Sequence, residues 1–252
     1  MKLVPLLRPM LLVFACVTLL ADAAASEESV SSQQRLHFAT AEVWPWGYLG
    51  ADGEPAGTLV EFANRIAAIV NLPLMNELRP HRRAIAELAS GTADFVVLFD
   101  SPTAEAAGIR VDKLLTMSIV IAGRADETYP LTLSGLAGRE VAYIRGSYYG
   151  EAFARDENII KVPVDALAQG LEMLRLRRVD AVVSSDQALY RTLEAQGLPA
   201  SEFRQGLVVG EQSASLFMSR NARFPELLEP VRQAMGRMRK TGELDSIFRL
   251  PR

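Results

Sequence analysis

The chain has 252 residues, with 27 Lys and Arg against 30 Asp and Glu and a formal net charge of −3. The basic residues are scattered among acidic ones and form no dense tract, which argues against a nucleic-acid partner. The single cysteine, Cys16, lies in an apolar segment near the N-terminus, so an intramolecular disulfide is excluded.

Residues 1–25 have the pattern of a secretory signal peptide. The basic residues Lys2 and Arg8 come first, and an apolar core follows at 10–20. Small residues at possible cleavage sites come next, at Ala21, Ala23 and Ala25. The apolar core is shorter than the roughly 20 residues that a transmembrane helix needs. A lipoprotein signal at Cys16 is disfavoured, because apolar residues continue beyond it. We therefore expect export to the periplasm and a soluble, monomeric mature protein.

The next segment predicts an α/β unit. A strand-like run, "RLHFAT" (35–40), leads into the aromatic loop "EVWPWGYLG" (42–50). In "GTLVEFANRIAAIVNL" (57–72) the apolar residues recur at helical spacing, which predicts an amphipathic helix. The segment "AIAELASGTADFVVLFD" (84–100) then predicts a second helix, a short turn and a buried strand.

A second copy of this pattern follows. The segment "GLEMLRLRRVDAVVSSD" (170–186) aligns with 84–100 without a gap, and Asp94 matches Asp180 while Asp100 matches Asp186. It too is preceded by a strand-like run and an aromatic loop, "EVAYIR" and "GSYYGEAF". Strands that alternate with helices predict a largely parallel sheet in each copy. We therefore expect two α/β lobes.

The ends of the predicted strands indicate a small-molecule site. In open α/β sheets, ligands bind outside the carboxyl ends of the strands. In both lobes this rule collects aromatic and polar residues, namely Glu42, Trp44, Trp46, Tyr48, Asp100, Ser101, Thr103, Ser147, Tyr148, Tyr149, Ser184, Ser185 and Asp186. In "GSYYG" the glycines allow a turn, and a tyrosine ring can form a wall of the site. The alternative is that one tyrosine packs inside its lobe and the other lies on the surface.

Several segments together resemble a known family. These are "WPWGYLGADGEPAGTLVEFANRIA", "RPHRRAIAELASGTADFVV", "LSGLAGREVAYIRGSYYG", "RRVDAVVSSD" and "LLEPVRQAMGRMRKTGELDSIF", in this order. The chain resembles a divergent branch of the bacterial extracellular solute-binding proteins of family 3, the polar amino-acid-binding type. The resemblance implies a two-lobed periplasmic-binding-protein fold (type II) with two crossings, near 117–126 and 210–219. Its expected parts are 35–122 and 213–252 for the first lobe and 123–212 for the second.

The chain also departs from this family at the expected ligand contacts. Family members carry a Thr-x-x-Arg element whose arginine binds the ligand α-carboxylate, but here the stretch is "TAEA", with Thr103 kept and Ala106 in place of the arginine. Ser185 stands where the resemblance implies an aspartate for the α-amino group, and Asp186 follows it. The segments "PHRRA" and "GSYYG" are similar to the divergent branch, which makes Arg83 and Tyr149 the candidates that the resemblance supports.

These residues predict a specific site. We expect Trp46 and Tyr149 to approach one ligand from opposite lobes, with Arg83 and Asp186 offering charges of opposite sign. Arg83 should matter more than Arg82, because adjacent helical side chains point about 100° apart. The alternative is that Arg82 and Arg83 only solvate the first turn of a helix.

The expected function is capture of a small, amino-acid-like solute in the interlobe cleft and its presentation to an ABC transporter. The alternatives are a receptor for a membrane signalling partner and an enzyme similar to cyclohexadienyl dehydratases, with Glu42, Asp100 or Asp186 as the acid. The sequence has no P-loop and no Gly-x-Ser-x-Gly motif. Its only histidines, His37 and His81, have no metal-binding spacing, so we expect neither a metal nor a cofactor.

Overall fold

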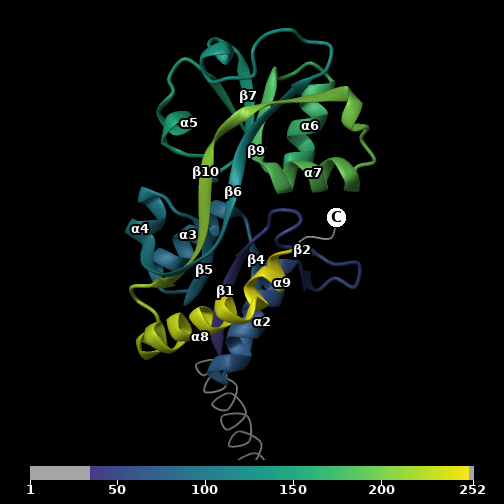
Figure 1. The fold of residues 1–252 in the computed structure, drawn as a ribbon. Helices are drawn as coiled ribbons and strands as arrows, with labels where there is room; N and C mark the ends of the chain where they lie inside the picture. The colour runs from purple at the N-terminus through teal and green to yellow at the C-terminus, as the bar shows by residue number, and fades with distance from the viewer. Residues whose placement is uncertain (1–34, 250–252) are drawn as a thin grey trace, which may run out of the picture.

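A computed structural model describes residues 35–249 of the chain (Figure 1). The predicted signal peptide, residues 1–25, lies outside the described residues. Within 35–249, no helix is long and apolar enough to cross a membrane.

One eight-stranded sheet runs through both lobes in the order β4-β1-β5-β10-β6-β9-β7-β8. Its strands are β1 Leu36–Ala41, β4 Leu74–Arg79, β5 Phe95–Phe99, β6 Gly108–Arg124, β7 Glu140–Ile144, β8 Ile160–Val164, β9 Ala181–Ser185 and β10 Phe203–Ser219. A separate hairpin pairs β2 Tyr48–Leu49 with β3 Pro55–Ala56. The strands β4-β1-β5 of lobe 1 are parallel, as are β9-β7-β8 of lobe 2. The predicted parallel sheets are therefore present, but the crossing strands join them into one.

The two crossings between the lobes are the long strands β6 and β10, which run side by side in Figure 1. They pair antiparallel along their length, from Gly108 opposite Ser219 to Arg124 opposite Phe203. β10 also pairs with β5 in lobe 1, and β6 pairs with β9 in lobe 2. The crossings expected near 117–126 and 210–219 thus fall largely on one two-stranded connection.

Helices cover both faces of the sheet in each lobe. They are α2 Thr58–Val70, α3 His81–Ser90, α4 Pro102–Ala107, α5 Glu151–Arg155, α6 Leu167–Arg175, α7 Asp186–Ala195, α8 Leu228–Thr241 and α9 Glu243–Phe248. In lobe 1, α2, α8 and α9 pack on one face and α3 and α4 on the other (Figure 1). The periodicity of α2 is the reason: Leu59, Phe62 and Ile66 are buried against the sheet.

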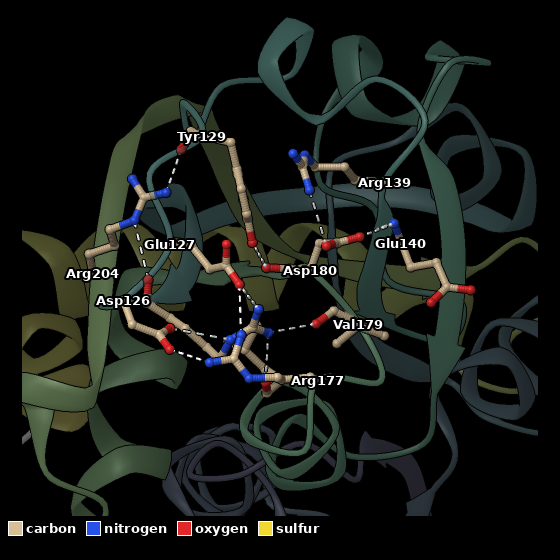
Figure 2. A network of polar contacts seen from close by, with 11 residues as sticks. Asp126, Glu127, Tyr129, Arg139, Glu140, Arg177, Val179, Asp180 and Arg204 are labelled. Carbon is tan, nitrogen blue, oxygen red and sulfur yellow. Dashed lines mark hydrogen bonds and ion pairs between the residues drawn. The ribbon is translucent and has the colours of Figure 1, made fainter.

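The two lobes repeat one structural device. In lobe 1 the buried carboxylate of Asp94 accepts a hydrogen bond from the backbone N–H of His37 (2.8 Å) and pairs with Arg223. In lobe 2 the carboxylate of Asp180 accepts one from the N–H of Glu140 (2.9 Å) and pairs with Arg139, as Figure 2 shows. Each aspartate thereby holds the start of the first strand of its lobe, so the two residues that match in the sequence repeat occupy equivalent places.

A polar network anchors the crossing strands at the far end of lobe 2 (Figure 2). Arg124, the last residue of β6, donates to the carbonyls of Leu174 (3.0 Å) and Val179 (3.3 Å). Cζ of the Arg139 guanidinium lies 3.8 Å from the centroid of the Tyr129 ring, and the Tyr129 hydroxyl donates to the Asp180 carbonyl. The end of β6 is therefore fixed to lobe 2 at a place remote from the space between the lobes (Figure 1).

Candidate functional site

A cavity of about 70 Å³ lies between the two lobes. Lobe 1, lobe 2 and the crossing strands all line it. The lining residues from lobe 1 are Ala41, Val43, Trp46, Leu59, His81, Val97, Leu98 and Phe99, and those from lobe 2 are Ile144, Ser147, Tyr149, Ser184, Ser185 and Ala188. The crossing strands contribute Leu115, Met117 and Ala214. We call this space the central cavity. Most of these residues lie at or just beyond the carboxyl ends of β1, β5, β7 and β9, where the strand-end rule places a ligand.

The "GSYYG" loop brings lobe 2 close to the rest of the molecule. Gly146 (φ 86°) and Gly150 (φ 94°) adopt left-handed conformations that disfavour other residues. A Cβ atom on Gly146 would lie 2.6 Å from Cγ of Arg82 in lobe 1, and one on Gly150 would lie 3.0 Å from Nε2 of Gln212 in β10. The two glycines therefore permit a close approach between the lobes as well as a turn.

Tyr149 belongs to the core of lobe 2 and also lines the central cavity. It is 4% exposed, and its ring packs near Phe99 and Phe153, with centroid distances of 6.4 and 6.3 Å. Burial raises the pKa of its hydroxyl to about 12, although hydrogen bonds with Ser147 and the Ile144 backbone oppose this shift. The hydroxyl is therefore neutral and already has partners in the protein.

His81 reaches the central cavity from the start of α3. Burial lowers the pKa of its ring to about 4, so the imidazole is neutral near pH 7. Its Nδ1 is enclosed and has no hydrogen-bond partner among residues 35–249. From the sequence, His81 was expected at the edge of the cleft or on the surface, because a single histidine has no spacing pattern that indicates a binding role.

The two tryptophans of the first aromatic loop have different environments. Trp46 is 6% exposed, lies in the core of lobe 1 and lines the central cavity. Trp44 is 39% exposed, and its Nε1 donates to the carbonyl of Arg191 on α7 of lobe 2 (3.3 Å). Glu42 and Trp44 line a separate interlobe space of about 290 Å³ at the edge of the molecule. Trp44 therefore joins the lobes outside the central cavity.

A further space of about 290 Å³ adjoins the central cavity and shares His81, Phe99, Ser147 and Tyr149 with it. Ser101, Thr103, Tyr148 and Lys161 also line this adjoining space. The structure thus brings Trp46, Ser147, Tyr149 and Ser185 to the central cavity, and Thr103 and Tyr148 to its neighbour.

The expected charged residues are placed differently. Arg83 has a side chain that is 65% exposed and forms an ion pair with Glu87 (2.8 Å), one turn along α3. Asp186 lies outside the central cavity, where its Oδ1 accepts from the N–H of Gln187 (2.7 Å). Local partners on their own helices thus explain why neither charge faces the cavity, in contrast to the expectation from the sequence.

Asp100 is also turned away from the central cavity. Its Oδ2 lies 3.5 Å from Nη1 of Arg110 on β6, and Asp100 does not line the cavity. The gapless repeat shifts by two residues here, because Ser101, which follows Asp100, caps α4 through the N–H of Ala104 (3.1 Å), while Ser185, which precedes Asp186, caps α7 through the N–H of Ala188 (3.3 Å). Asp100 and Asp186 are therefore not structural equivalents relative to the helices that follow.

The chemistry available in the central cavity is limited. Of the lining residues within 35–249, none is Asp, Glu, Lys or Arg. Among residues 35–249, no group of three or more His, Cys, Asp and Glu side chains is arranged to hold a metal ion. Apolar walls with a few hydroxyls and one neutral imidazole suit reversible binding of a small molecule.

Comparisons with known proteins agree with this architecture. The model of the bacterial extracellular solute-binding proteins, family 3, matches residues 36–249. An ancestral arginine-binding protein bound to arginine is 21% identical, with a TM-score of 0.74 over 86% of this chain and 97% of that one. The substrate binding protein of an amino acid ABC transporter is 19% identical, with a TM-score of 0.72 over 84% and 96%.

A histidine kinase sensor domain with similarity to periplasmic binding proteins has the same fold. It is 20% identical, with a TM-score of 0.73 over 85% of this chain and 94% of that one. Among curated proteins no sequence matches significantly. At these identities the solved structures show a shared fold, and they leave the ligand and the partner to be argued from the residues.

Proposed function

Because the chain belongs to family 3 of the bacterial extracellular solute-binding proteins, we propose that it captures a small solute by closing its two lobes around the central cavity. The observation that carries this proposal is that both lobes and a crossing strand contribute residues to the cavity walls. Trp46 comes from lobe 1, Tyr149 from lobe 2 and Met117 from a crossing strand, so a ligand there touches all three parts. A bound molecule would stabilise the closed arrangement relative to an open one.

The crossing strands support a hinge motion. Among residues 35–249, only β6 and β10 connect the strands of the two lobes: they pair with each other, β10 pairs with β5 in lobe 1, and β6 pairs with β9 in lobe 2. Two lobes joined by a narrow pair of strands can rotate with little change inside either lobe.

The closed form would then be presented to a membrane partner. We propose an ABC permease, in line with the solved substrate binding protein of an amino acid transporter that has this fold. A sensor is the second candidate, because a histidine kinase sensor domain also has this fold. An exported, periplasmic monomer is the form in which either role would operate.

Ligand binding is favoured over an enzymatic reaction by the residues of the cavity. A dehydratase-like reaction needs a carboxylic acid that protonates a leaving group. None of the three candidate acids, Glu42, Asp100 and Asp186, lines the central cavity.

A ligand screen tests the proposed function. Amino acids, polyamines, small carboxylates, aromatic acids and small uncharged alcohols and amides are tested by thermal shift, because a ligand of the folded state raises its apparent stability. At least one class should raise the melting temperature and reduce the radius of gyration in small-angle scattering. A complete absence of binding, or binding with an unchanged radius, would contradict capture by closure.

A further inference from the structure

Among the residues that the structure describes, none on the walls of the central cavity carries a formal charge. Its ionisable residues are His81 and Tyr149, and both are neutral near pH 7 because burial lowers the pKa of the first to about 4 and raises the pKa of the second to about 12. In the adjoining space the only charged side chain among the described residues is Lys161, whose Nζ already donates to the carbonyls of Ala154 (2.9 Å) and Asp156 (2.6 Å).

The absence of charge matters because the cavity walls are mainly apolar. Transfer of an ionised carboxylate or ammonium group from water into such a space is unfavourable unless an opposite charge or several hydrogen bonds receive it. A zwitterion brings one group of each sign, so it needs two such receivers, and the walls of the central cavity provide neither.

The backbone at the cavity is also occupied. The N-terminus of a helix is a common place for a carboxylate, because its first N–H groups lack partners within the helix. In α7 the N–H of Gln187 donates to Oδ1 of Asp186 (2.7 Å) and the N–H of Ala188 donates to Oγ of Ser185 (3.3 Å). These side chains of the protein itself thus take two of the amides that an anionic ligand would use.

Two neutral polar atoms remain free. Oγ of Ser184 and Nδ1 of His81 are buried without a hydrogen-bond partner in the described part of the chain, and both residues line the central cavity. Ser184 belongs to lobe 2 and His81 to lobe 1. A buried polar atom that lacks a partner is unfavourable, so a ligand that bonds to both atoms would stabilise the closed form.

We propose that the central cavity binds a small, uncharged and mainly apolar molecule that carries a hydroxyl or carboxamide group. The apolar part contacts residues such as Val43, Met117 and Ile144, and the polar group bonds to Ser184 and His81. This inference rests on the proposed function, because it names the class of solute that closure would capture.

Matched probes test this ligand class in the full-length protein by calorimetry. The probes of the first series share one aliphatic group and are leucine, isoamylamine, isovalerate, isoamyl alcohol and isovaleramide. The probes of the second series share one aromatic group and are phenylalanine, phenethylamine, phenylacetate, phenethyl alcohol and phenylacetamide. In at least one series the alcohol or amide should bind about tenfold more tightly than every charged relative, because only the charged probes lose hydration without an opposite charge.

A serine pair tests the assigned contact. Ser184→Ala should weaken binding of the preferred alcohol or amide about tenfold, the usual order for one lost hydrogen bond. Ser215→Ala is the matched control, since Ser215 is also a buried serine with an unpartnered hydroxyl but does not line the cavity. Equal affinities of the two variants would overturn the contact with Ser184.

The outcomes separate this inference from the proposed function. Tightest binding by leucine, phenylalanine or another charged probe, with closure of the lobes, would overturn the ligand class and leave capture by closure intact. A failure of every alcohol and amide to bind would also overturn the ligand class. If no compound of the wider screen binds either, the proposed function fails as well.

Discussion

At the scale of single residues, Trp46 combines two roles that the sequence pattern does not separate. It lines the central cavity, yet it is buried in the core of lobe 1 together with Leu59 and Phe62. Loss of binding on its removal would therefore not by itself indicate a lost ligand contact.

A comparison of the two tryptophans shows this difference. Trp46→Ala should lower the free energy of unfolding by about 3–5 kcal/mol, because it leaves a cavity in the core. Trp44→Ala should lower it by less than about 1 kcal/mol, since Trp44 is 39% exposed. Urea denaturation followed by circular dichroism measures both. Similar losses for the two variants would mean that Trp46 is not a core residue.

His81 predicts how binding depends on pH. Its pKa is about 4 when the lobes enclose it, whereas a hydrated imidazole in an open cleft has a pKa near 6.5. Closure therefore favours the neutral ring, and affinity should fall as the pH drops below about 6.5, to about a tenth at pH 5.5 of its value at pH 7.5.

Variants of the two histidines provide the control for this pH effect. His81→Gln should remove the pH dependence, whereas His37→Gln should keep it, because His37 lies at the start of β1 away from the cavity. Affinity should be measured by calorimetry at several pH values. A wild-type affinity that stays constant from pH 7.5 to 5.5 would show that His81 does not change its environment on closure.

At the scale of the elements, Asp94 and Asp180 hold equivalent strands with different strength. The Asp94 side chain is fully buried and binds the N–H groups of His37 and Arg223 as well as the Arg223 guanidinium. The Asp180 side chain is 31% exposed. Removal of a buried ion-pair partner costs about 3–5 kcal/mol, whereas an exposed pair contributes up to about 1 kcal/mol.

We therefore expect Asp94→Ala to destabilise the protein by at least about 2 kcal/mol more than Asp180→Ala. Chemical denaturation of both variants in parallel measures this difference. Equal destabilisation would indicate that burial of the Asp94 carboxylate does not decide its contribution.

The "GSYYG" loop predicts an effect on closure. Gly146→Ala places a methyl group 2.6 Å from Cγ of Arg82, so it opposes the approach of the lobes and should weaken ligand binding about three- to tenfold. Gly138→Ala is the control, because Gly138 also has a positive φ (75°) but has no atom within 4 Å of the added methyl group. Both variants carry backbone strain, but only Gly146→Ala should lose affinity in calorimetry. Equal affinities would remove this loop from the closing contact.

The contact at Gly146 also changes the expectation for the two arginines of α3. Arg82, which approaches lobe 2, should now affect binding more than Arg83, which is paired with Glu87 on the exposed side of the helix.

Features of the structure that depend on short-range sequence patterns could be predicted, whereas those that depend on the direction of a side chain could not. The helix–strand repeat and the match of Asp94 with Asp180 depend on short-range patterns, and the structure contains both. The strand-end rule collected Trp46, Ser147 and Tyr149, because strand ends define a region whichever way each side chain points. Neither this rule, for Asp186, nor the family resemblance, for Arg83, predicted the direction of the side chain, since each is engaged by a neighbour within its own helix.

At the scale of the whole molecule, the family and the fold were predictable because five weak motifs occur in a fixed order, and the family model confirms the family over residues 36–249. The single continuous sheet was not predicted. It arises because β10 pairs with β5 in lobe 1, β6 pairs with β9 in lobe 2, and the two long strands pair with each other, which depends on partners distant in sequence.

The central claim is that the lobes close about β6 and β10 around a ligand in the central cavity. Spin labels at Glu61→Cys on α2 and Leu176→Cys beyond α6, in a Cys16→Ala background, report the distance between the lobes from two exposed positions. Double electron–electron resonance should show a broad or longer distance without ligand and a shorter, narrower one at saturating concentrations of a ligand identified in the screen. An identical distance distribution with and without that ligand would contradict the account.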